Sequence, residues 1–153
     1  MLTARPASAW RNRYDVALDG RPLTTWEASF WKQGGAFTLD GRRFEVRSST
    51  WGTKSTMVDE MGGEVAAAER VGRKRWTVSY AGQTYTFRRH SMWSQRQDLY
   101  VGDNAVGYAR RTSAWRREVE LDLPGVPVPA QVFVLGVVIA LWDAETAAVA
   151  GGS

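Results

Sequence analysis

Apolar and polar residues alternate with a period of two along much of the chain. Tyr14, Val16 and Leu18 fall on one face of such a segment, and Asp15 and Asp19 fall on the other. The same alternation recurs in segments 26–30, 44–47, 76–80, 85–87 and 118–123. A period of two gives a strand one wet face and one dry face, which is typical of half-buried antiparallel sheets. The pattern predicts a mainly β domain.

Turn signals separate these segments roughly every ten residues, as in an antiparallel meander. They are Asp19-Gly20, Asp40-Gly41, Gly62-Gly63, Gly72, Gly82, Gly102-Asp103-Asn104 and Pro124-Gly125. Asp-Gly is favoured in tight hairpins because both central residues adopt positive φ, which Asp and Gly tolerate. We expect an aromatic hairpin in which Trp76, Val78 and Tyr80 are followed across the turn by Tyr85 and Phe87.

One segment, from Val132 to Trp142, is apolar at every position. Its β-branched residues would also suit a strand buried on both faces. We favour a helix over about 129–147, because good helix formers continue the run and no turn signal interrupts it. A helix that is apolar all round is buried in protein or in lipid. Residues 126–142 carry no charge but are at the short limit for a membrane span, and few basic residues follow them. A helix buried inside the β meander is therefore the favoured interpretation, and a membrane anchor is the alternative.

Length and composition are those of one folded domain. The chain has 153 residues, of which 44% are hydrophobic and 24% charged. We expect a single domain over 1–153 with a core of about 13–147 and short flexible tails at both ends. The absence of cysteine excludes disulfides, zinc–thiolate sites and a thiol nucleophile, and fits a reducing cytoplasm. The first ten residues lack the apolar stretch of a secretion signal, so we expect a cytoplasmic protein.

The chain shows no catalytic pattern. His90 is the only histidine, so a multi-histidine metal site is excluded. The serines at 48, 49, 91 and 94 have no nucleophile elbow around them. The glycine pairs at 34–35 and 62–63 match neither a dinucleotide fingerprint nor a phosphate loop. We expect a non-enzymatic protein with no catalytic residue, no metal and no cofactor.

A β meander that ends in an all-apolar helix resembles the tubby C-terminal-like superfamily, especially its LURP-one-related and phospholipid-scramblase-like branches. The stretches that carry the resemblance are 57–64 (MVDEMGGE), 74–80 (KRWTVSY), 85–90 (YTFRRH), 123–133 (LPGVPVPAQVF) and 141–142 (LW). The resemblance covers most of the chain, from Tyr14 to Trp142. It implies a closed antiparallel barrel of about twelve strands around a central hydrophobic C-terminal helix.

The resemblance also implies a class of ligand. Tubby-like proteins bind phosphoinositide head groups through basic residues on the barrel wall, and scramblase-like relatives associate with membranes. This chain has neither a cysteine-rich palmitoylation segment nor a convincing acidic calcium loop, so scrambling activity is not expected. The resemblance carries fold more safely than function, because one fold hosts many functions.

Basic residues cluster where the expected strands end. The net charge is +4, and arginine accounts for all but three of the 20 basic residues. Arginine has a planar fork that suits phosphate, although a GC-rich genome would give the same bias. The candidate ligand-binding residues are Arg88, Arg89, Arg110, Arg111, Arg116 and Arg117. Adjacent residues point to opposite faces of a strand, so at most one of each pair shares a surface with the neighbouring pair. The alternative is a solvated rim whose charge is offset by Glu118 and Glu120.

Two tryptophans, Trp93 and Trp115, lie in segments beside these arginines. We expect them in the core or as lids over a barrel end; the alternative is exposed anchors at a membrane interface. Nucleic acid is not favoured, since the chain has no RNP-type strand motif and only mild charge. We therefore expect a binding module for an anionic phospholipid, a phosphoinositide or another phosphorylated ligand, peripheral to the membrane. The alternative is a structural or protein-interaction domain without a lipid ligand. The oligomeric state is not predicted.

Overall fold

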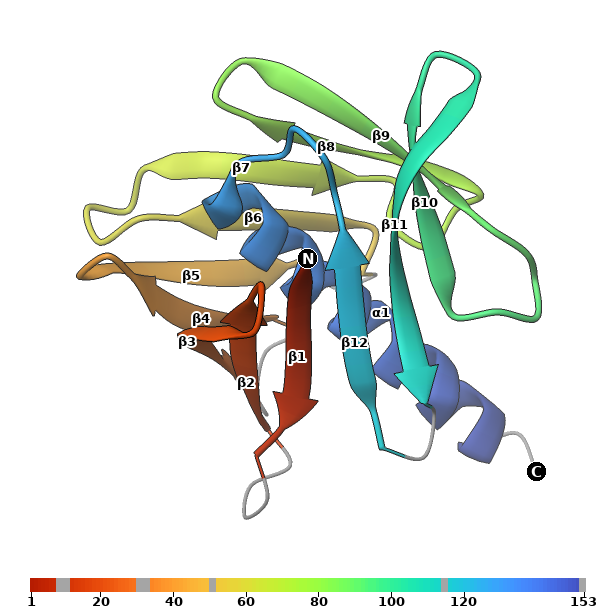
Figure 1. Cartoon of the computed structure of the whole chain (residues 1–153), viewed down its shortest axis with the longest axis horizontal. Helices are drawn as coiled ribbons and strands as arrows, with labels where there is room; N and C mark the ends of the chain where they lie inside the picture. The colour runs from red at the N-terminus through yellow and green to blue at the C-terminus, as the bar shows by residue number, and fades with distance from the viewer. Residues whose placement is uncertain (8–11, 30–33, 50–51, 114–115, 152–153) are drawn as a thin grey trace.

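Twelve consecutive antiparallel strands close into a barrel around one helix (Figure 1). The computed structural model describes residues 1–7, 12–29, 34–49, 52–113 and 116–151, with only the backbone of Ala150. The elements are β1 (Leu2–Pro6), β2 (Arg13–Leu18), β3 (Arg21–Ala28), β4 (Gly34–Leu39), β5 (Arg42–Ser48), β6 (Lys54–Val58), β7 (Glu64–Glu69), β8 (Arg75–Tyr80), β9 (Gln83–Arg89), β10 (Arg96–Val101), β11 (Asn104–Ser113), β12 (Glu118–Asp122) and α1 (Val128–Gly151). The expected closed barrel around a hydrophobic C-terminal helix is confirmed.

The barrel is closed by the first strand, β1. We expected a flexible tail before residue 13, and this was wrong, because β1 pairs with β2 on one side and with β12 on the other. Leu2 lies opposite both Leu18 and Leu121, and it is fully buried. Only Leu2 and Ala4 of this strand point into the barrel. Two apolar positions are too few to reveal a period of two in the sequence.

Tight turns join the strands where Asp-Gly predicted them. Asp19 and Gly20 have φ values of 50° and 82°, and Asp40 and Gly41 have 51° and 76°. Two successive residues with positive φ twist a two-residue hairpin in the same sense as its strands. The aromatic hairpin also forms as expected, with Trp76 opposite Phe87 and their rings stacked at 4.6 Å.

Helix α1 fills the barrel. All residues from Val132 to Ile139 are buried, and Trp142 is 1% exposed. The helix begins one residue before the predicted start and runs on to Gly151, past the predicted end at 147. It fits closely against the wall at Gly136, where an added Cβ would lie 2.4 Å from the ring of Trp26.

The apolar composition of α1 is explained by the barrel. Residues 128–149 form a helix long and apolar enough to cross a membrane. However, half of an apolar 18-residue stretch within it is buried inside the protein. The buried residues pack against the inward faces of the strands, which form one core with the helix. A membrane is thus not required to account for a helix that is apolar on every side.

The two ends of the barrel differ. We call the end where α1 begins the entry end; it contains the turns at 19–20, 40–41, 59–63, 81–82 and 102–103 and the segment 123–127. We call the other the exit end; its described parts include the loops at 70–74, 90–95 and 116–117 and helix residues 143–151. Because every connection is a hairpin, successive turns lie alternately at the entry and exit ends. In Figure 1 the helix runs from upper left to lower right, so the C-terminus marks the exit end.

Candidate functional site

Charge is separated between the two ends. The strand termini and turns of the entry end carry Asp19, Asp40, Asp59, Glu60, Glu64, Asp103 and Asp122 against Arg21, Arg42 and Arg43. The described strand termini and loops of the exit end, with the helix residues 143–151, carry Arg5, Arg13, Arg47, Lys54, Arg70, Arg73, Lys74, Arg75, Arg88, Arg89, Arg96, Arg116 and Arg117 against Glu27, Glu69, Glu118, Asp143 and Glu145. The entry end is therefore acidic and the exit end strongly basic.

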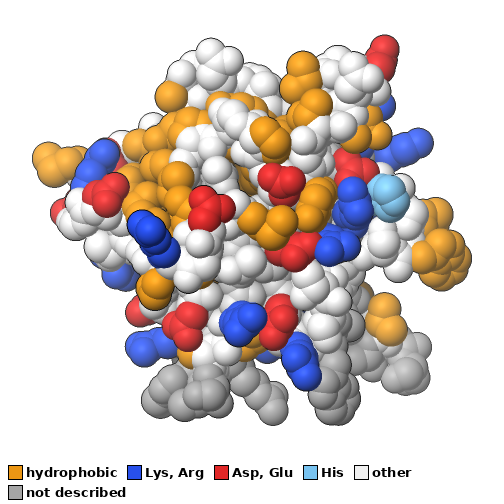
Figure 2. Space-filling model, in the orientation of Figure 1, with side chains coloured by type: hydrophobic (Ala, Val, Ile, Leu, Met, Phe, Trp, Pro, Cys, Tyr) orange, Lys and Arg blue, Asp and Glu red, His pale blue; other side chains and the backbone are white. Residues whose placement is uncertain are grey.

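The six candidate arginines do not form one surface. Arg88 and Arg110 lie on the outer wall of the barrel, where Arg88 covers the ring of Tyr100 at 4.3 Å and Arg110 bonds to Glu120. On the same wall Arg96 donates to Asp98 at 2.8 Å. Figure 2 shows basic and acidic side chains interleaved beside the histidine. The outer wall is thus a paired network, as the alternative of a solvated rim supposed for this part.

Arg111 and Arg117 come together at the exit end around one carboxylate. Arg111 Nη2 donates to Asp143 Oδ1 at 3.1 Å, and Arg117 Nη2 donates to Asp143 Oδ2 at 3.2 Å. Arg117 also donates to the Tyr14 hydroxyl at 2.7 Å. The Arg111 side chain is only 3% exposed and lies over the ring of Trp142. We call these four residues, Tyr14, Arg111, Arg117 and Asp143, the exit cluster.

The local sequence explains how the exit cluster forms. Arg111 is opposite Val119, whose side chain is buried, so it points inward while its neighbour Arg110 points outward. Arg117 has a φ of 56° in the turn before β12, which is uncommon for a residue with a Cβ. Asp143 is the first charged residue after the apolar run of α1. It therefore reaches the barrel mouth at the point where the buried part of the helix ends.

Burial changes the acidity of two groups here. Burial raises the pKa of Tyr14, Asp143 adds to the rise, and Arg117 and Arg111 oppose it. Burial also raises the pKa of Glu145, while Arg89 and Arg111 lower it. Arg89 thus lies near the end of the helix with the exit cluster. Arg116, by contrast, is exposed, and its backbone N–H donates to the Ser113 hydroxyl.

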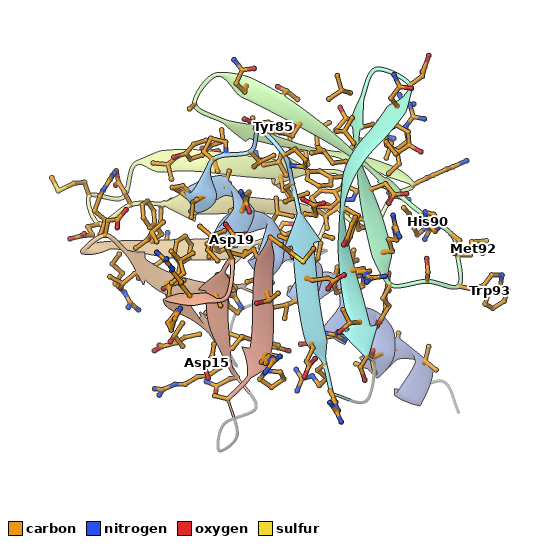
Figure 3. The ribbon with its side chains drawn as sticks, in the orientation of Figure 1. Asp15, Asp19, Tyr85, His90, Met92 and Trp93 are labelled. Carbon is orange, nitrogen blue, oxygen red and sulfur yellow. The ribbon has the colours of Figure 1, made fainter. Side chains whose placement is uncertain are left out.

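A cavity of about 750 Å³ opens in front of the exit cluster. Its lining residues are Trp93, Gln95, Arg111, Arg117, Asp143, Thr146 and Ala147. We call it the exit cavity. The expectation that Trp93 lies in the core was wrong, because its side chain is 95% exposed. Figure 3 shows Met92 and Trp93 at the tip of the loop between β9 and β10, pointing away from the barrel. Trp115 lies outside the described residues.

His90 forms a pair with a buried carboxylate. Its Nδ1 lies 2.7 Å from Oδ2 of Asp98, whose side chain is 8% exposed. The nearby serines bond to each other, with Ser91 Oγ donating to Ser94 Oγ at 3.0 Å. The histidine is half exposed and directly follows β9. In the described part of the chain no group of three or more His, Cys, Asp or Glu side chains is arranged to hold a metal ion.

Sequence reasoning missed several residues of this site. Tyr14 and Asp143 were assigned only to a strand face and to the helix, and Gln95 was not considered. The basic run 73–75 was not among the candidate residues. The order of the turns could have placed this run beside the other arginines, because every second turn of an antiparallel meander lies at the same end of the barrel.

Comparison with known proteins identified no relative of this chain. No protein-family model matches the chain, and neither a curated protein nor a solved structure matches it. The class of protein is therefore defined by the structure alone, as a twelve-strand antiparallel barrel with an apolar helix inside and a basic exit end.

Proposed function

We propose that this protein is a non-enzymatic binding module that docks on an anionic phospholipid surface through its exit end. One observation carries the proposal: most of the exposed basic residues of the described chain, and the exposed Trp93, gather at one end of a barrel whose other end is acidic. An anionic surface attracts the first end and repels the second, so it selects one orientation of the molecule.

The attraction comes from basic side chains that are free to reach a surface. Arg73, Lys74, Arg75 and Arg116 are all exposed at the exit end. A basic residue near an anionic bilayer contributes about 1 kcal/mol, and the interaction fades within a Debye length, about 10 Å at 0.1 M salt. Four such residues suffice for measurable binding at low salt and for its loss at high salt.

The loop between β9 and β10 adds an apolar contact. Met92 is 79% exposed and Trp93 is 95% exposed, next to the arginines of the exit cavity. An exposed tryptophan costs free energy in water, but at a bilayer interface its apolar ring and its N–H are both accommodated. The neighbouring helix end also exposes Val149, at 78%.

The proposal includes membership of the tubby-like superfamily and a cytoplasmic, membrane-peripheral location. Twelve strands around an apolar C-terminal helix support the first part. The proposed surface differs from the arginine set expected from the sequence. It uses 73–75, Arg116 and Trp93, whereas Arg88 and Arg110 belong to the paired outer wall.

The test is co-sedimentation of the detergent-free protein with vesicles of neutral phosphatidylcholine alone or mixed with anionic phosphatidylserine. We expect binding only to the anionic vesicles. The triple variant R73Q/K74Q/R75Q should bind about 100-fold more weakly, since three contacts of about 1 kcal/mol are lost. The matched control is R21Q/R42Q/R43Q, which removes three exposed arginines from the entry end. Equal losses in both triples, or binding that ignores lipid charge, would refute the docking surface.

A further inference from the structure

The exit cluster contains more positive than negative charge. Two guanidinium groups, which remain charged at any pH a folded protein meets, share the single carboxylate of Asp143. The more buried of the two, Arg111, is 3% exposed, so water does little to balance its charge. Arg89 and Glu145, which lie nearby, offset each other. A local surplus of one positive charge remains beside the exit cavity.

Arg111 also has a hydrogen-bond donor without an acceptor. Its Nε is buried and has no hydrogen-bond partner in the described part of the chain, as is also true of Arg88 Nε and Trp26 Nε1. Buried donors in folded proteins are nearly always paired, so an unpaired donor on a side chain that lines a cavity is a candidate partner for a bound group. The side chain that carries this donor lines the exit cavity, together with Arg117 and Gln95.

The cavity has the size and lining for a small organic anion. Its volume of about 750 Å³ lies within the usual range of ligand pockets. The two guanidinium groups offer fork-shaped donor sets that match the oxygens of a carboxylate or a phosphate. Gln95 adds a neutral polar group, and Trp93 at the rim offers a ring against which a flat apolar group can stack.

We propose that the exit cavity is a discrete binding pocket for a phosphate monoester or carboxylate that carries a flat apolar group. The oxyanion lies against Arg111 and Arg117, and the apolar group lies against Trp93. Asp143 is an internal carboxylate that already holds both arginines, so it competes with the ligand and limits its affinity. The oxyanion site is separate from the docking surface, because the exposed basic residues that meet a vesicle lie outside the exit cluster; Trp93 belongs to both.

The first experiment is a calorimetric titration of the full chain with phenyl phosphate and with inorganic phosphate. We expect both to bind, and phenyl phosphate to bind more tightly. R117Q should weaken both by about tenfold or more, because it removes a charge-assisted hydrogen bond to the ligand. R21Q is the matched control: it removes an exposed arginine from the opposite end of the barrel and should leave both affinities unchanged. Equal losses in R21Q and R117Q, or no binding by the unaltered chain, would overturn the pocket.

Two further variants test the roles of Asp143 and Trp93. D143N removes the competing charge and should tighten phosphate binding, and weaker or unchanged binding by a folded D143N would disprove the competition. If D143N does not fold, the comparison of R21Q with R117Q decides alone. W93A should abolish the preference for phenyl phosphate over inorganic phosphate, and a preference that persists would show that Trp93 takes no part.

The pocket and the docking surface can fail separately. R73Q/K74Q/R75Q should lose vesicle binding and keep phenyl phosphate binding, whereas R117Q should do the reverse. If phenyl phosphate binds but vesicles do not, the oxyanion comes from a soluble molecule and the docking surface is wrong. If vesicles bind and excess phenyl phosphate displaces them, the pocket takes a lipid head-group phosphate.

Discussion

The entry and exit ends of the barrel are built differently from the same kind of hairpin. At the entry end, turns such as 19–20, 40–41 and 81–82 are two residues long and sit at positive φ. At the exit end the described connections include the longer loops 70–74 and 90–95, and this end also holds the exit cluster, in which Arg111 is buried, and the exit cavity. The entry end closes the barrel mainly with short turns, while the exit end carries the groups that can meet a ligand.

The two ends also carry opposite charge. The entry end, where α1 begins, is acidic, and the exit end, where the buried part of α1 ends, is basic. A net charge of +4 therefore describes neither end.

The largest difference in stability between the ends should appear in their ion pairs. D143A leaves Arg111 buried and unpaired, so we expect the free energy of unfolding to fall by about 3 kcal/mol. The entry-end pair between the Met1 amine and Asp19 is exposed, with side chains 43% and 77% accessible. D19N should therefore cost about 0.5 kcal/mol or less. Urea unfolding of both variants tests this, and similar losses would show that burial does not distinguish the pairs.

A smaller effect is expected from a turn at the entry end. Gly41 has a φ of 76°, and an added Cβ would meet no atom within 4 Å. G41A should therefore destabilise the protein only through backbone strain, by about 1–2 kcal/mol. Binding of vesicles and of phenyl phosphate should not change, because the turn lies at the opposite end. Altered binding by the folded variant would mean that the two ends are coupled.

The smallest effect concerns alkaline pH at the exit end. The pKa of Tyr14 lies above its ordinary value of 10.0, so the folded chain holds this proton more tightly than the unfolded chain does. The resulting stability is fully present below pH 10 and is lost as the pH rises through the folded-state pKa. Y14F, which has no phenol proton, should show a shallower loss of stability above pH 10. Thermal unfolding from pH 9 to 11 measures the two slopes, and parallel slopes would contradict this assignment.

Much of the fold could be predicted from the sequence because it follows from short-range patterns. Alternation and Asp-Gly turns specify hairpins, and a fully apolar segment such as 132–142 must be enclosed. The strand β1 could not be predicted, since two inward residues make no recognisable period. Its role in closing the barrel depends on β12, which lies more than a hundred residues away.

The candidate site was harder to predict, because it depends on contacts between distant elements. Clusters of arginine were visible, but which of them pair with carboxylates was not. Arg110 and Arg111 are adjacent in sequence, yet one bonds to Glu120 on the outer wall and the other to Asp143 on the helix. The exposure of Trp93 was also missed, since composition alone favours burial of a tryptophan.

The position of the helix has a consequence for how the chain is made. During synthesis every strand leaves the ribosome before α1, and the inward faces of the strands have nothing to pack against until residues 132–142 emerge. In addition, β1 cannot pair with β12 until β12 has been synthesised. The protein should therefore acquire its native packing late in translation, in a step dominated by contacts between distant segments, which are slow to form. Until then, its apolar strand faces stay exposed, which favours aggregation.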